Sequence, residues 1–149
     1  MLGELTGPQI NTLLANNVLG RIGCHDMGQS YVVPITYVFD DDSIIGHSAP
    51  GKKIDMMRSN PRVCFQVDQM EDMGNWQSVI AWGLFEELKG DEALRAITLF
   101  VRKLSPYITS ETSRPTHGFN LEKFDPQEMK SIIFKIRIGK KTGRFEKRP

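Results

Sequence analysis

The chain has 149 residues, of which 40% are hydrophobic and 25% are charged, which is enough apolar material for a single globular domain spanning residues 1–149. It is too short for a (β/α)₈ barrel, which needs about 200 residues or more, and no apolar run approaches the roughly 18 residues of a membrane span. The net charge of +1 gives no overall case for nucleic-acid binding.

The basic residues are concentrated at the C-terminal end. Residues 135–149 have a net charge of +6, against +1 for the whole chain. We interpret them as a solvated strand and terminus, so a nucleic-acid partner is not expected. The first ten residues lack the charged and apolar regions of a signal peptide, which predicts a cytoplasmic location. The cysteines and histidines show no metal-ligand spacing, so no metal site is predicted.

The N-terminal segment predicts a short helix over residues 7–17. Thr6 is placed to cap it, and Pro8 suits its first turn. Its apolar residues recur three and four positions apart, as one face of a helix requires. They are Ile10, Leu13 and Leu14.

The apolar period then changes to two, which is typical of strands. We predict one strand over residues 18–24 and a stronger one over residues 31–40. A turn over residues 40–43 leads into Ile44 and Ile45 and predicts a hairpin. The stronger strand would place four side chains on one face: Val33, Ile35, Tyr37 and Phe39.

The middle of the chain predicts a second short helix over residues 51–59, which must end before Pro61. A strand over residues 62–68 should follow, and residues 69–76 are predicted to be a polar loop. A long strand over residues 78–88 contains Gly83, a candidate bulge. The inward side chains of the strand before the loop would be Val63, Phe65 and Val67.

The last third predicts a helix that is capped by Asp91 and ends near Leu104. Residues 105–130 are predicted to be irregular, with Pro106, Pro115 and Pro126 among them. A final strand over residues 131–138 would end before a turn at residues 141–143. The apolar side of the helix would be Leu94, Ile97, Val101 and Leu104.

These elements make about six antiparallel strands with two or three peripheral helices. Strands do not alternate regularly with helices, which argues against a doubly wound parallel sheet. A small antiparallel sheet avoids exposed edges by closing into a barrel. The predicted fold class is therefore mainly β, a barrel with α-helices outside it.

The segment 46–53, Gly-His-Ser-Ala-Pro-Gly-Lys-Lys, carries the clearest chemical signal. It leaves a strand, turns, and enters a helix that has Lys52 and Lys53 in its first turn. The Ser48 hydroxyl, free helix N–H groups and two ammonium groups would then surround one small volume, which suits a phosphate monoester. The alternative is an ordinary turn with both lysines in water. A triphosphate-binding loop is not favoured, because Lys53 stands where that motif needs Ser or Thr.

The order of several short motifs resembles the pyridoxamine 5′-phosphate oxidase-like family of flavin-binding split β-barrels. It is most similar to the branch of nitroimidazole-resistance-type proteins. Each motif is weak alone, and their shared order over most of the chain makes the match specific. They are residues 20–23, 31–37, 47–53, 60–65, 76–83 and 142–144.

The resemblance implies FMN bound at the interface of a homodimer, in two equivalent sites. It places Val33, Pro34, Ile35 and Thr36 along the flavin ring and ribityl chain. Ser48, Lys52 and Lys53 would hold the 5′-phosphate, in agreement with the anion site above. His47 would lie near the flavin or its substrate as a candidate catalytic residue. Trp76, Gln77 and Ser78 would contact the ring edge.

The resemblance leaves two functions open. One is a cytoplasmic FMN-dependent oxidoreductase acting on a small electron acceptor, with the hydride and electron chemistry supplied by the flavin. The other is a flavin or haem binding or sensor protein without turnover. Oxidation of vitamin B6 is not expected, because the oxidase proper ends in a Trp- and Arg-bearing segment and this chain has no Trp after Trp82.

Overall fold

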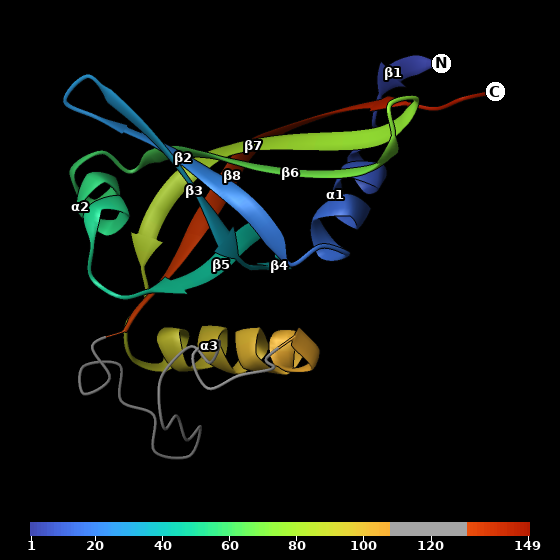
Figure 1. The fold of residues 1–149 in the computed structure, drawn as a ribbon. Helices are drawn as coiled ribbons and strands as arrows, with labels where there is room; N and C mark the ends of the chain where they lie inside the picture. The colour runs from blue at the N-terminus through green and yellow to red at the C-terminus, as the bar shows by residue number, and fades with distance from the viewer. Residues whose placement is uncertain (108–130) are drawn as a thin grey trace.

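The computed structural model describes residues 1–107 and 131–149 (Figure 1). The described residues are mostly strand, which confirms the predicted class. The helices are α1 (Gly7–Ala15), α2 (Lys52–Ser59) and α3 (Gly90–Leu104), followed by a 3₁₀ turn at Ser105–Tyr107. The strands are β1 (Leu2–Glu4), β2 (Leu19–Asp26), β3 (Gln29–Thr36), β4 (Val38–Asp40), β5 (Ser43–Ser48), β6 (Arg62–Asp72), β7 (Asn75–Glu87) and β8 (Ile132–Glu146).

The strands form one antiparallel sheet in the order β3-β2-β6-β7-β8-β5-β4, with β1 added beside β8. Strands β3 and β4 follow each other in the chain but lie at opposite ends of this order. The sheet therefore curls back on itself and leaves a seam between its two ends, which is the split-barrel architecture that the resemblance implied. None of the helices described here is long and apolar enough to cross a bilayer.

Two apolar clusters hold the sheet together. The larger cluster lies inside the curled sheet and contains Phe65 and Phe134, both fully buried. The smaller one lies between α3 and the strands β4, β5 and β8. Strand β5 joins them, because Ile44 faces the first cluster and Ile45 the second. The predicted inward residues Val63, Phe65 and Val67 are all buried.

The predicted strand over residues 31–40 is in fact two strands, β3 and β4. The chain changes partner at Tyr37, which lies between them: β3 pairs with β2, and β4 pairs with β5. The buried Tyr37 hydroxyl donates to the Leu14 carbonyl at 2.6 Å, and this bond ties the junction to α1. The apolar alternation continues across the break, so it gave no sign of the change.

Two predicted loops were wrong. Residues 69–76 are not a polar loop but the ends of β6 and β7, which turn at Met73 and Gly74. Residues 141–143 are not a turn, because β8 continues beside β7 as far as Glu146. Both segments lie on the arm of the sheet that extends toward the chain termini (Figure 1). Residues 69–76 are all exposed or half-buried, so this segment lacks the apolar alternation that identifies a strand with one buried face.

Other predicted details are settled by the backbone. Thr6 caps α1 within a capping box, as predicted. The hairpin turn between β4 and β5 is confirmed, with Asp41 and Asp42 both in the left-handed region. The bulge predicted near Gly83 is confirmed as a register shift between β7 and β8 at that point.

Helix α3 differs from its prediction in two ways. Its N-cap is Lys89 and no side chain caps it, so Asp91 stands in the first turn instead, where its charge favours the helix dipole. Leu94 is 36% exposed and is not part of the buried face. That face consists of Ala93, Ala96, Ile97, Phe100 and Leu104. Residues 108–130, with Pro115, Pro126 and His117, lie outside the described part of the chain.

Candidate functional site

The first turn of α2 lies at one end of the barrel, just after β5 ends at Ser48. Gly51 occupies the N-cap position and offers no side-chain cap, so the first N–H groups of α2 keep free donor capacity. The other end of the helix is fixed to the β2–β3 hairpin. Ser59 Oγ donates to Asp26 Oδ1 at 3.0 Å, and Asn60 Nδ2 donates to the His25 carbonyl at 2.8 Å.

Lys53 is the half-buried cation of this turn. Burial lowers the pKa of its ammonium group, and the neighbouring Cys24 on β2 opposes that change. None of the ion pairs within residues 1–107 and 131–149 involves Lys53. A partly desolvated cation without a counter-ion is unfavourable, and an anion beside it would remove the penalty.

Lys52 takes a different direction from Lys53. Its Nζ lies 4.9 Å from the centre of the Tyr31 ring on β3, within the range of a cation–π interaction. Both lysines still lie near the buried Cys24 thiol. Burial and Cys64 raise the pKa of that thiol, and the charges of Lys52 and Lys53 oppose this change. The structure thus brings the two predicted lysines to the same end of the barrel and gives them different neighbours.

His47 and Ser48 end β5 beside this turn. The His47 ring packs edge-on against Phe100 of α3, with ring centres 4.9 Å apart and planes at 87°. Burial, with a smaller contribution from the charge of Lys53, lowers the pKa of His47 to about 4, so the imidazole is neutral at pH 7. The Ser48 hydroxyl donates to the Ala49 carbonyl at 2.7 Å, which holds the loop in a tight turn.

Strand β3, which contains the predicted residues 33–36, is one end of the sheet order, and its outer edge pairs with no strand in the described chain. The Tyr37 N–H donates to the Val18 carbonyl at 2.9 Å. In an antiparallel pair, alternate residues direct their backbone groups toward and away from the partner strand. Because Tyr37 bonds toward β2, the residue before it and every second residue before that face away from β2. These are Val32, Pro34 and Thr36, and Pro34 fits there because it has no N–H to offer β2.

The side chains of these residues alternate as strand geometry requires. Ile35 is buried and Val33 half-buried on the core side, whereas Pro34 and Thr36 are exposed on the other. The open edge of β3 thus offers carbonyl oxygens and N–H groups beside a small exposed surface. Such a strip suits a planar ligand that carries its own donors and acceptors.

Trp76, Gln77 and Ser78 lie elsewhere. They are at the arm of β7, where Trp76 pairs with Met70. Leu84 of the same strand pairs instead with Arg62, which comes three residues after the end of α2. Eight residues of strand separate Trp76 from Leu84, roughly 26 Å, and Figure 1 places the arm and α2 at opposite ends of the barrel. One chain alone does not bring these three residues to the lysines.

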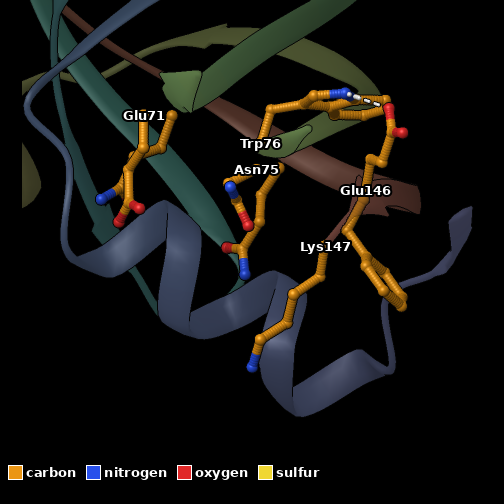
Figure 2. A pocket seen from close by; sticks show the side chains of 8 residues that line it. Glu71, Asn75, Trp76, Glu146 and Lys147 are labelled. Carbon is orange, nitrogen blue, oxygen red and sulfur yellow. Dashed lines mark hydrogen bonds between the residues drawn. The ribbon is translucent and has the colours of Figure 1, made fainter. Parts of the chain in front are cut away.

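The arm has a pocket of its own, of about 230 Å³ (Figure 2). The Trp76 indole forms one wall, and its Nε1 donates to Glu146 Oε2 at 3.1 Å. Amide and charged side chains complete the lining around the indole. They are Gln69, Glu71, Asn75, Gln77 and Lys147, with Phe145. The Ser78 hydroxyl lies outside this lining and accepts from Gln66 Nε2 at 3.3 Å.

The outer face of β2, β3, β6 and β7 has exposed apolar side chains that no other part of the described chain covers. Two strands, β3 and β7, contribute exposed apolar side chains, namely Val32 at 65%, Leu84 at 51% and Trp82 at 41% exposure. These residues line a groove of about 700 Å³, with Cys64 also in its lining. Contiguous exposed apolar surface of this kind marks an interaction site.

Sequence reasoning missed the contact between Lys52 and Tyr31 and the open edge of β3. Tyr31 was only one aromatic residue in a predicted strand, and nothing in its neighbours' identities points to Lys52. The open edge follows from the order of strands in the sheet, which local alternation does not contain. The proximity of Lys53 to the buried Cys24 could not be inferred from the sequence either.

Comparison with known proteins identifies relatives over nearly the whole chain. The sequence profile of the pyridoxamine 5′-phosphate oxidase family matches residues 8–132. A FAD-binding protein from Mesorhizobium loti is 30% identical, with a TM-score of 0.77 over 97% of this chain and 98% of that one. A putative 5-nitroimidazole antibiotic resistance protein from Bacteroides thetaiotaomicron is 21% identical and has the same fold, with a TM-score of 0.73 over 97% and 87% of the two chains.

A curated relative matches over a shorter region. The protein RA0666 of Rhizobium meliloti (strain 1021), whose function is uncharacterised, is 40% identical over 76 residues. The match covers 51% of this chain and 50% of that protein. The chain therefore matches about half the length of this relative.

Proposed function

The chain belongs to the pyridoxamine 5′-phosphate oxidase family, and from this premise we propose that it binds FMN and acts as an oxidoreductase on a small electron acceptor. The observation that carries the proposal is Lys53, a half-buried ammonium group without a carboxylate partner in the described chain, at the uncapped start of α2. The relative from Mesorhizobium loti, which is described as FAD-binding, supports a flavin as the ligand.

The residues present fit a flavin phosphate. Lys53 and the free N–H groups of α2 would hold the phosphate oxygens, with Ser48 shaping the loop and Lys52 adding charge nearby. The open edge of β3 would face the ring, whose amide-like groups complement the backbone groups of Pro34 and Thr36. This assignment uses side chains that have no other ionic partner among the described residues.

We further propose that two copies of the chain form each site. Trp76, Gln77 and Ser78 lie on the arm of β7, and roughly 26 Å of strand separates Trp76 from Leu84 at the other end of the barrel. We therefore expect them to complete a flavin site only on a neighbouring copy. The apolar outer face supplies a surface for this association, because Val32, Trp82 and Leu84 are exposed in one chain. A dimer would bury that face and enclose the ring.

When bound, the flavin would supply hydride and electron transfer. The chain's own residues would position the ring along β3, exclude water through the apolar face, and hold the phosphate at α2. His47 would act as a neutral imidazole, since its pKa of about 4 keeps it unprotonated at pH 7.

The first test is flavin binding itself. Protein purified in native buffer should be yellow or should take up added FMN, with an absorption spectrum and a mass that identify the ligand. Lys53→Met should weaken FMN binding about 10-fold or more, the loss of a charge-assisted contact. The matched control Lys89→Met, at the exposed start of α3, should bind as the parent does. A colourless protein that binds no FMN would refute the proposal.

Turnover is tested separately from binding. The flavin-loaded protein is mixed with NADH or NADPH under anaerobic conditions, and a quinone or nitro compound is then added. Bleaching of the flavin followed by its return with the acceptor is the result expected of an oxidoreductase. Two results together would identify a binding protein instead. The flavin stays oxidised with either NADH or NADPH, and protein reduced with dithionite fails to pass electrons to the acceptor.

A further inference from the structure

The two adjacent lysines of α2 contact different parts of the barrel. Lys53 is half-buried beside Cys24 and close enough to His47 to affect its pKa. Lys52 is exposed, and its ammonium group lies over the Tyr31 ring at 4.9 Å. Successive residues of a helix point about 100° apart, so the two ammonium groups are suited to two neighbouring anionic groups rather than to one.

The second of these positions lies farther along the same strand. A ligand whose ring lies beside Thr36 and Pro34 runs toward Val32 and then reaches Tyr31. The four-residue step from Thr36 to Val32 spans about 13 Å, a length that the ring and ribityl chain of a flavin fill. Cys24, whose pKa both lysines lower, is the β2 partner of Tyr31, so a group that continues beyond the first phosphate would lie near Tyr31 and Lys52.

The surface beyond the first phosphate is held in place. His25 Nδ1 and Ser30 Oγ are 3.3 Å apart across the β2–β3 hairpin, and Ser59 and Asn60 fix the hairpin to the end of α2. Tyr31 is half-buried and packs against the core cluster, so its ring presents a fixed face. A rigid aromatic face beside an ammonium group without an ionic partner in the described chain suits an aromatic base joined to a phosphate.

We propose that Tyr31 and Lys52 form a second subsite, which takes the adenine ring and second phosphate of FAD. Lys52 would move from the Tyr31 ring to the second phosphate, and the adenine would stack on the exposed Tyr31 face. Lys53 would hold the phosphate shared by FMN and FAD. The site then binds the dinucleotide more tightly than the mononucleotide. This inference rests on the proposed flavin function and names the residues that select between the two flavins.

The test compares two ligands on four proteins. FMN and FAD are titrated into flavin-free parent protein and into the variants Tyr31→Leu, Lys52→Met and Lys53→Met, and binding is followed by flavin fluorescence. The parent should bind FAD about tenfold more tightly than FMN, as one stacked base contributes. Tyr31→Leu should remove most of that preference and leave FMN affinity within about twofold, and Lys52→Met should weaken FAD binding more than FMN binding. Lys53→Met should weaken both ligands.

Controls separate the subsite from the fold. Tyr107→Leu, at an exposed tyrosine after α3, should change neither affinity. Tyr31→Phe keeps the aromatic face and should keep the preference for FAD. This variant still tests the subsite if the Tyr31→Leu protein does not fold. Equal affinities of the parent for FMN and FAD, or equal weakening of both by Tyr31→Leu and Lys52→Met, would overturn the inference. Binding of neither flavin by the parent would instead refute the proposed function.

Discussion

Acidification should destabilise the flavin-free protein through one half-buried imidazole, that of His47. The pKa of His47 is lowered from 6.5 to about 4 by burial and by the nearby charge of Lys53. Between those two values the unfolded chain binds a proton that the folded chain does not, so folding stability falls as the pH falls from 6.5 toward 4. At pH 4.5 the loss from this group is about 2–3 kcal/mol, since one pKa unit corresponds to about 1.4 kcal/mol.

The assay is urea unfolding of flavin-free protein at pH 7 and pH 4.5. His47→Gln removes the titrating ring, so its stability should fall less on acidification than the parent's, by about 2–3 kcal/mol. His25→Gln removes an exposed histidine on the β2–β3 hairpin and should follow the parent. If the stabilities of His47→Gln and the parent fall in parallel, the pKa of His47 is not lowered in the folded protein and the reasoning is wrong.

Three further substitutions test the packing and the site. Lys53→Met in flavin-free protein should raise the urea midpoint, because it removes a half-buried cation that has no ionic partner in the described chain, and a lowered midpoint would contradict that view. Gly83→Ala should cost about 1–3 kcal/mol, since an added Cβ would lie 2.3 Å from the Arg137 carbonyl oxygen; thermal unfolding measures it, and an unchanged Tm would argue against the bulge geometry. Tyr37→Phe should cost about 1–2 kcal/mol by leaving the buried Leu14 carbonyl without its donor, and a neutral effect in urea unfolding would show that water replaces the hydroxyl.

The parts of the fold that the sequence predicted correctly are those with a core on one side. Val63, Phe65 and Val67 alternate because the inside of the barrel is apolar and the outside is not. The tip of the arm, where β6 turns into β7, has little core beneath it, so Met70 and Met73 are exposed and the strand pattern disappears there. Hydrogen bonds between neighbouring strands maintain the arm, and these depend on backbone pairing rather than on side-chain type.

The candidate site was predictable only in part for a similar reason. The segment 46–53 contains its whole signal in consecutive residues, so the turn, the helix start and the two lysines could be inferred together. The contact between Lys52 and Tyr31 joins residues that lie 21 positions apart, and it depends on how α2 packs against the β2–β3 hairpin. Trp76 illustrates the limit further, since its predicted role requires a second copy of the chain.

The position of Lys53 is best understood as a compromise between stability and binding. A methionine in its place would fill the same space at the barrel end without a desolvation penalty, and α2 already has Ile54 and Met57 as buried anchors. An apolar residue at position 53 would therefore stabilise the fold more than the lysine does. Its partial burial does strengthen its attraction for an anion, because the surrounding dielectric is lower than that of water. A residue that weakens the empty protein and strengthens a charged complex is expected at a binding site and not in a purely structural turn.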